Sequence, residues 1–292
     1  IGDTHHPFGG CDSQKSGVTP TERSYAFSIP NQTWTPLADM PFLAGNGQPG
    51  TGVTHAGVTT DGANIYLAGG FVSADGENGQ KFGTKEVYRY SIADDAYTRL
   101  PDLPEERSSG SLVYLDGRLH FISGSNTART TEPTDHYVLD LSGGATAWAS
   151  AAPLPEGRNH PSAVASGGLI YFIAGQTGHD GPSVAHADVW SYDPATDAWT
   201  ARAPIPQAVN HAVSATFVMG DRIVVAGGKT THTTFTDKVW AYDPGTDTWD
   251  ELSPLPTARG GGVAGPYAEG FVYTGGFGAD AGAKGVRATP TP

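Results

Sequence analysis

The chain contains little cysteine and little positive charge, and each shortage excludes classes of protein. Cys11 is its only cysteine, so no disulfide can form within the 292 residues. The 17 Lys and Arg residues stand against 30 Asp and Glu, which leaves a net charge of −13. Proteins that bind nucleic acid or anionic lipid usually present a basic face. We therefore expect neither nucleic acid nor a membrane as a partner.

Long apolar runs are also missing, and none is long enough to span a membrane. The sequence begins with Ile1 instead of methionine, which a removed signal peptide would explain, as would processing of another kind. Few lysines and many Thr, Gly, Asp and Ala residues suit an exported protein. We predict a secreted or periplasmic location, with the cytoplasm as the alternative.

Glycine and proline are abundant, with 40 and 22 residues, while only 16% of residues are charged. This composition favours many short strands joined by turns over long helices. It predicts an all-β fold.

One phrase occurs several times at a nearly constant interval. "VWSYDPATDAWTARAPIP" begins at Val189, and "VWAYDPGTDTWDELSPLP" begins at Val239. Each copy has an aromatic residue seven positions before a proline. The five pairs are Trp34 and Pro41, Tyr97 and Pro104, Trp148 and Pro155, Trp199 and Pro206, and Trp249 and Pro256. A period of about 50 residues is typical of propeller repeats.

A second phrase lies between the copies, as in "GANIYLAGG" (62–70) and "GDRIVVAGG" (220–228). It predicts a buried strand that ends where glycine lets neighbouring backbone come close. With the shorter strand before it, each repeat has four strands. We name them a, b (ending in Gly-Gly), c ("VWxYD") and d (with the aromatic before "LP").

These spaced features resemble the kelch repeat over residues 25–276. The resemblance implies a kelch-type β-propeller with four-stranded antiparallel blades around a central channel. We predict one propeller domain over residues 1–292, with five blades. The c and d strands near the N-terminus (24–42) would close the ring by pairing with the a and b strands near the C-terminus (261–276). Six blades are the alternative, because "FGG" at 8–10 resembles the end of a b strand.

In the kelch family the d-to-a and b-to-c loops lie on one face and usually form the binding surface. Here the b-to-c loops are long, at 71–85, 125–135, 176–187 and 229–237. Long loops at one end of a rigid scaffold commonly carry function. The segment "DTHHPFGGC" (3–11) groups two histidines with Cys11, and it is either a further site or a mobile chain end.

Histidine begins three of the five a strands, at His55, His160 and His211. Rotational symmetry would place the three imidazoles around the channel, where they could bind one divalent transition metal (Zn, Cu, Mn or Fe). They could instead act in metal-free catalysis or ligand contact, or hydrogen-bond to backbone groups. Neither the metal-free catalytic or ligand-binding role nor the structural role needs a cofactor.

Other polar residues recur near the same loops. Arg107, Arg158 and Arg259 either tie loops together or form a cationic pocket for an anionic ligand, with Arg158 as a catalytic residue. Asn159 and Asn210 precede two of the histidines and could orient a polar substrate. Gln176 and Lys229 follow the glycine signal and would point to the same rim.

We therefore predict a monomeric enzyme of the lyase, isomerase or cyclase type. It would act on a sugar or another small polar molecule, with histidine as base or metal ligand and arginine stabilising negative charge. The alternative is a non-catalytic kelch binding module that recognises a glycan or a protein through its loop face, since propellers host many functions.

Overall fold

The computed structural model describes residues 1–11, 17–45, 47–48, 52–73, 77–179, 182–278 and the backbone of 286–288. These residues form β-strands and one short 3₁₀ helix, η1 (Val213–Ala215), as the composition predicts. No helix among them is long and apolar enough to cross a membrane. The chain divides into two compact units, residues 1–153 and 154–292.

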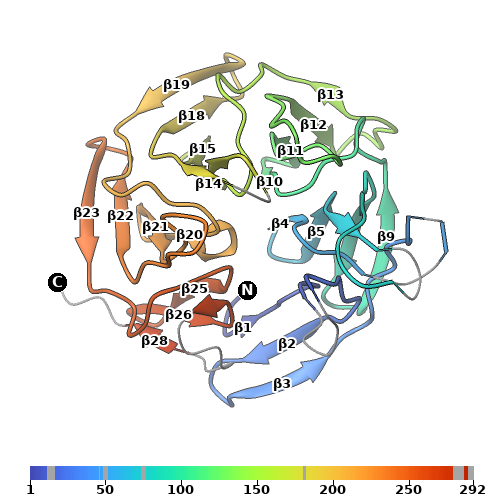
Figure 1. The fold of residues 1–292 in the computed structure, drawn as a ribbon, viewed down its shortest axis with the longest axis horizontal. Helices are drawn as coiled ribbons and strands as arrows, with labels where there is room; N and C mark the ends of the chain where they lie inside the picture. Colours follow the sequence, from blue (N-terminus) through green and yellow to red (C-terminus); the bar gives the residue numbers. More distant parts are fainter. Residues whose placement is uncertain are drawn as a thin grey trace. The chain divides into compact units, whose positions relative to one another are not determined.

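The first unit contains three antiparallel sheets of three or four strands, coloured blue to green in Figure 1. In order along the chain, they are β1 (Thr4–His5), β2 (Tyr25–Ser28) and β3 (Thr33–Pro36); then β4 (Gly57–Thr60), β5 (Asn64–Ala68), β8 (Val87–Ser91) and β9 (Ala96–Leu100); then β10 (Ser111–Leu115), β11 (Arg118–Ile122), β12 (His136–Asp140) and β13 (Ala149–Ser150). Within the loop between β5 and β8, β6 (Phe71–Val72) pairs with β7 (Phe82–Gly83).

The second unit also contains three such sheets, coloured yellow to red. They are β14 (Ser162–Ser166), β15 (Leu169–Ile173), β18 (Val189–Asp193) and β19 (Ala198–Arg202); then β20 (Thr216–Met219), β21 (Arg222–Ala226), β22 (Val239–Asp243) and β23 (Thr248–Leu252); then β25 (Val263–Tyr267), β26 (Gly270–Thr274) and β28 (Val286–Ala288). Two short pairs project from the sheets: β16 (Gln176–Thr177) with β17 (Val184–Ala185), and β24 (Arg259–Gly260) with β27 (Phe277–Gly278).

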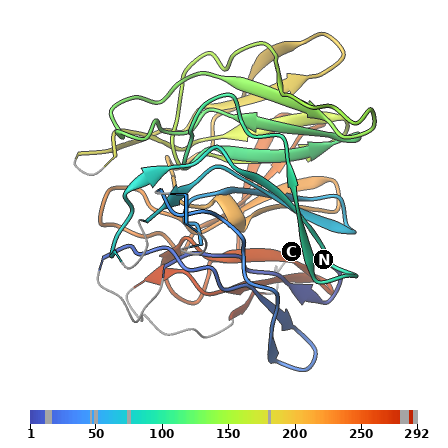
Figure 2. The same ribbon diagram turned by 90° about the vertical axis from the view of Figure 1, so that its right-hand side faces the viewer.

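Strands within each sheet run antiparallel, as Figure 2 shows from the side. The b strands are the most buried, because they pack on both faces; Leu67 and Phe121 in the first unit and Ile173 and Val225 in the second are almost inaccessible to solvent. The c and d strands pair as the repeated phrase predicts, with Tyr192 opposite Trp199 across the ladder. The four-strand repeat is therefore confirmed.

The d-strand aromatics also contact the preceding repeat within a unit. The indole N–H of Trp148 donates to the carbonyl of Pro101 (2.8 Å), and that of Trp249 donates to the carbonyl of Ala203 (2.9 Å). These contacts connect each d strand to the repeat before it. Trp34, on β3, is 50% exposed.

The predicted pairing between the two ends of the chain is wrong. Strand β2 pairs with β1 and β3, with His5 opposite Phe27, while β26 pairs with β25 and β28. The 24–38 hairpin and the 263–274 hairpin thus belong to different sheets. The described residues form six sheets of three or four strands, three in each unit.

The glycines of "FGG" give the physical reason. Gly9 and Gly10 have φ of 60° and 101°, and Gly69 and Gly70 at the end of β5 have 63° and 110°. The N–H of Gly10 donates to the carbonyl of Val53 (3.1 Å), as that of Gly70 does to Arg107 (2.8 Å). Only glycine adopts such angles readily. Strand β1 and the glycines that follow it therefore take the place of a b strand beside β2, the place predicted for the C-terminal hairpin.

Candidate functional site

The three predicted histidines share a backbone conformation. His55, His160 and His211 have φ of 57°, 51° and 56°, in the left-handed region that most side chains avoid. Ser109 and Gly261 occupy the same position in two other repeats, with φ of 55° and 69°. The turn at the start of strand a therefore recurs whether or not histidine is present. The backbone conformation therefore does not explain why histidine occupies this position in three repeats.

His55, in the first unit, is held by an amide. Its Nδ1 lies 2.7 Å from Nε2 of Gln80, whose Oε1 accepts a hydrogen bond from Arg129 (2.8 Å). Arg129 fixes the orientation of the Gln80 amide, so Gln80 donates and Nδ1 of His55 accepts. A neutral His55 then carries its proton on Nε2. In this tautomer Nε2 is a donor and cannot bind a metal.

His160 and His211, in the second unit, have the opposite tautomer. Nδ1 of His160 lies 2.6 Å from Oδ1 of Asn159, and Nδ1 of His211 makes a short contact with Oδ1 of Asn210. An amide oxygen only accepts, so each Nδ1 carries the proton and each Nε2 presents a lone pair. The two rings stack with centroids 3.8 Å apart and planes 15° from parallel. This pair is the part of the predicted histidine site that lies within one unit.

Sequence reasoning missed one more imidazole near this pair. The ring of His179, in the b-to-c loop, has its centroid 5.3 Å from that of His160. Its place in a long loop gave no periodic signal, because the b-to-c loops differ in length and sequence between repeats.

Asn159 and Gln176 form one polar pair. They exchange backbone hydrogen bonds of 2.9 and 2.8 Å, and their side-chain amides both donate to the carbonyl of Gly178, at 3.0 and 2.9 Å. Both side chains therefore brace the loop that follows β16. A role for them in substrate binding stays a prediction.

Asn210 and Lys229 occupy the same two positions in the next repeat, with backbone hydrogen bonds of 2.9 and 2.8 Å. Asn210 is buried, and its Nδ2 has no hydrogen-bond partner in the described part of the chain. Lys229 is half-buried, its ammonium lies 5.4 Å from the centre of the Phe235 ring, and burial lowers its pKa. In the described residues, the Asn210 amide N–H groups therefore have no acceptor, whereas the Asn159 amide of the previous repeat donates to Gly178.

The three arginines bind groups of their own loop and of neighbouring loops. Arg158 is 1% exposed and contacts the carboxylates of Glu156 (2.8 Å) and Asp188 (2.9 Å). These contacts raise its pKa despite the opposing effect of burial. Arg158 therefore connects the d-to-a loop to the residue before strand c, as expected of an arginine that holds loops together.

Arg107 and Arg259 follow the same pattern. Arg107 pairs with Asp135, and Arg259 donates to the carbonyl of Gly275 (3.1 Å) and to Oγ1 of Thr257 (3.2 Å). Such contacts support the loop-tying interpretation and give no support to a shared cationic pocket. Catalytic and substrate-binding roles for the arginines stay predictions.

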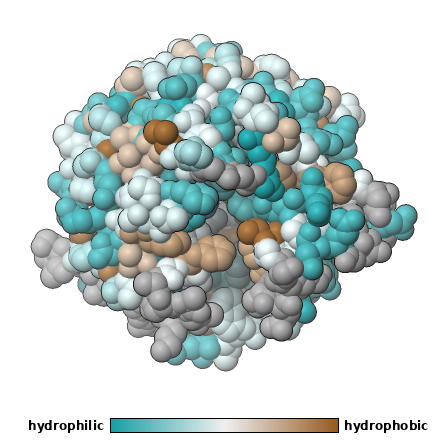
Figure 3. Space-filling view, in the orientation of Figure 1, coloured by the Kyte–Doolittle hydropathy of each residue, from teal (hydrophilic) through white to brown (hydrophobic). Residues whose placement is uncertain are grey.

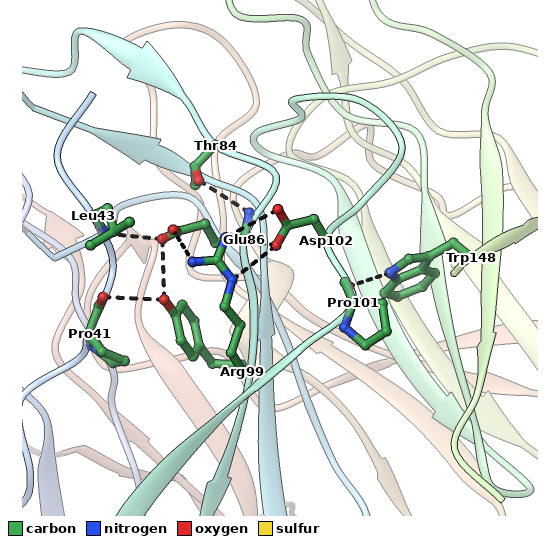
Figure 4. Close-up of polar contacts among 9 residues, drawn as sticks. Pro41, Leu43, Thr84, Glu86, Arg99, Pro101, Asp102 and Trp148 are labelled. Atoms are coloured by element: carbon green, nitrogen blue, oxygen red, sulfur yellow. Dashed lines mark hydrogen bonds and ion pairs between the residues drawn. The ribbon is translucent and has the colours of Figure 1, made fainter. Parts of the chain in front are cut away.

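A fourth charged network lies in the first unit and was not predicted (Figure 4). Glu86 is buried, and its carboxylate accepts the N–H of Leu43 (3.0 Å) and pairs with Arg99 (2.8 Å), which also contacts Asp102 (2.9 Å). Burial, together with the charge of Glu86, raises the pKa of Tyr88 to about 12. The signal was an acidic residue directly before strand c, a position that Asp135 and Asp188 share.

The b-to-c loops carry exposed apolar side chains. Phe82 on β7 is 40% exposed, Val184 on β17 is 60% exposed, and Phe277 on β27 is 57% exposed. Each lies in a two-stranded pair whose ladder hydrogen bonds fix the backbone. Phe82 also lines a hollow of about 260 Å³ beside Leu43 and Val72.

Comparison with known proteins identifies the family. The sequence profile of the KLHDC2/KLHL20/DRC7 Kelch-repeats domain matches residues 102–276. Kelch-like protein terF of Aspergillus terreus is 27% identical over 218 residues, which are 74% of this chain and 45% of that protein. Kelch-like protein 35 of Mus musculus is 28% identical over 222 residues, 75% of this chain and 33% of its own length.

The chain thus spans less than half the length of these two relatives. Among solved structures, that of YjhT covers 99% of this chain and 91% of its own, with a TM-score of 0.75 and 17% identity. This likeness shows the fold alone and confirms the predicted propeller class. The chain therefore belongs to the kelch-repeat family and has its all-β propeller fold.

Proposed function

We propose that this chain is a non-catalytic binding module that recognises a protein through its b-to-c loops. The observation that carries the proposal is the exposure of Phe82, Val184 and Phe277 on three different b-to-c loops. Single exposed apolar residues are common, but Phe82 and Val184 occupy the same position, on the second strand of the loop pair, and Phe277 directly follows the Gly-Gly end of its repeat. Exposed apolar side chains on several such loops are typical of a surface that contacts a partner. The rigid strand pairs beneath them reduce the entropy lost on binding.

Apolar loop residues favour a protein partner over a glycan. A glycan surface is rich in hydroxyl groups, and its recognition needs polar groups that are open to the ligand. The face shown in Figure 3 is mainly hydrophilic, with its hydrophobic residues in small separate patches. A protein partner would bury such patches and leave the polar surroundings as a solvated rim.

The test replaces Phe82, Val184 and Phe277 together by serine. The control is Val58→Ser, which removes an apolar side chain of similar exposure (39%) from β4, outside these loops. Proteins captured from a cell extract are identified and their affinities measured with purified components. A partner should bind the wild type and Val58→Ser equally and the triple variant at least about tenfold more weakly. Equal binding by all three proteins would contradict the proposal.

The stacked imidazoles support a second candidate, an enzyme acting on a small polar molecule by proton transfer. Nε2 of His160 and of His211 would serve as general bases or as two ligands of a divalent transition metal. The Asn side chains resemble the outer contacts that orient metal-bound histidines. His55 is the third predicted ligand, but the hydrogen bond from Gln80 to its Nδ1 works against binding through Nε2.

Elemental analysis of protein purified without an affinity tag tests the metal. We expect about one metal ion per chain in the wild type and in His232→Ala, which removes an exposed histidine of the same unit. His211→Ala should lose the metal and keep its fold. Metal-free wild-type protein after incubation with Zn²⁺ and desalting would eliminate the metal site and leave general-base catalysis as the remaining form of this candidate.

A further inference from the structure

The side chains of Asn210 and Lys229 leave the backbone on the same side. In an antiparallel pair that exchanges both backbone hydrogen bonds, the two side chains point to one face of the ladder. The equivalent pair, Asn159 and Gln176, demonstrates this here, because both side-chain amides reach the carbonyl of Gly178. Asn210 and Lys229 are thus neighbours at the start of the 229–237 loop.

The donors of Asn210 are buried and not satisfied within the described part of the chain. Asn210 is 2% exposed, and its Oδ1 is engaged by Nδ1 of His211. Its Nδ2 has no hydrogen-bond partner in the described residues. Buried amide donors in folded proteins almost always have an acceptor, so a lasting gap points to a group that the protein receives from outside.

The Lys229 ammonium makes no ion pair with any described carboxylate, although the chain carries 30 acidic residues. The ammonium instead lies over the uncharged ring of Phe235, 5.4 Å from its centre. By contrast Lys238, in the same loop region, pairs with Glu251. A half-buried cation without a counter-ion leaves a local positive charge.

We propose that Asn210 and Lys229 form a binding site for a carboxylate. One amide N–H and one ammonium supply two donors at separate points, which matches the two oxygens of a carboxylate. One positive charge balances a monoanion, whereas a dianionic phosphate would leave excess negative charge in a chain of net charge −13. The carboxylate belongs either to an acidic peptide side chain or to a small organic acid. This site goes beyond the proposed protein contact and does not involve its apolar residues.

The test follows the side-chain amide signals of ¹⁵N-labelled protein by NMR during titration with sodium acetate. The Asn210 signals are assigned from their absence in Asn210→Asp, a variant that keeps the acceptor for His211 and replaces the donor by a negative oxygen. In the wild type these signals should shift and saturate, whereas acetamide, the neutral analogue, should cause no saturable shift.

Two variants and one control test whether acetate binds at Asn210 and Lys229. Backbone signals of Asn210→Asp should no longer respond to acetate, and Lys229→Gln should bind at least about tenfold more weakly. Lys238→Gln makes the same change in net charge and should bind like the wild type. If Asn210→Asp fails to fold, Lys229→Gln alone still decides. Absence of a saturable shift in the wild type, or wild-type binding by Lys229→Gln, would overturn the proposal.

Two further probes separate the sources of the carboxylate. Tighter binding of N-acetyl-aspartate methylamide than of acetate indicates a peptide, and tighter binding of glucuronate indicates a small sugar acid. The Phe82, Val184 and Phe277 triple variant should bind acetate like the wild type. Loss of protein binding in that variant and loss of acetate binding in Lys229→Gln are therefore independent results.

Discussion

Asp247 joins two repeats of the second unit, and its replacement by alanine tests how the repeats are held together. Its Oδ1 accepts the hydroxyl of Tyr242 (2.6 Å) and the backbone N–H of Ala203 (2.8 Å), which lies one repeat earlier. These hydrogen bonds lower the pKa of Asp247. The same tyrosine–aspartate contact occurs between Tyr192 and Asp197 (2.7 Å). It is therefore a regular element of the repeat.

The magnitude follows from the two donors. A hydrogen bond to a charged group contributes about 1.5–3 kcal/mol to stability. Tyr242 is fully buried, so its hydroxyl loses the charged acceptor Asp247. Asp247 itself is partly exposed, so water replaces part of the lost hydrogen bonding. We expect Asp247→Ala to lower the free energy of unfolding by about 2–4 kcal/mol. Asp247→Asn keeps the acceptor oxygen and should cost about 1 kcal/mol.

Urea unfolding followed by circular dichroism measures these differences, with Asp221→Ala, an exposed turn residue, as the control. Combining Asp247→Ala with Tyr242→Phe should cost less than the sum of the two single variants, because they remove the same contact. The reasoning is refuted if Asp247→Ala matches the control, or if Asp247→Asn costs as much as Asp247→Ala.

Two further predictions concern pH and backbone conformation. Burial lowers the pKa of His120 to about 3 from its ordinary 6.5. Between these two pH values the unfolded chain binds a proton at His120 and the folded chain does not. The free energy of unfolding should then fall as pH decreases from 6.5 towards 3, by up to about 1.4 kcal/mol per pH unit. His120→Gln should flatten this slope in urea titrations at several pH values, and an unchanged slope would contradict the assignment. Gly228 has φ of 112°, and a Cβ there would lie 2.4 Å from the Val209 side chain, so Gly228→Ala should cost about 2–4 kcal/mol in thermal unfolding. Gly220→Ala, with open space around it, should cost about 1 kcal/mol, and equal losses would argue against steric exclusion at Gly228.

The sequence alone determined the strand repeat, because each strand, turn and Gly-Gly end is encoded by neighbouring residues. The alternation in "VWSYD", the turn at "DPATD" and the angles of Gly69 and Gly70 depend on local sterics and on the face each side chain occupies. The same local pattern located His160 and His211 at equivalent strand starts. It could not show that their rings stack, since contact between repeats depends on how the sheets pack.

Only the tertiary structure decided which partners the polar side chains bind within the described chain. Residues 4–5, and not the C-terminal hairpin, pair with β2, because two strand segments compete for one edge and the spacing in sequence does not rank them. Gln80 sets the tautomer of His55, and Asp188 engages Arg158, through contacts 25 and 30 residues apart. Asn159 and Asn210 look alike in the sequence, yet one amide is satisfied by Gly178 and the other is left with its donors unpaired within the described chain. That difference arises from the path of each loop, which no local pattern specifies.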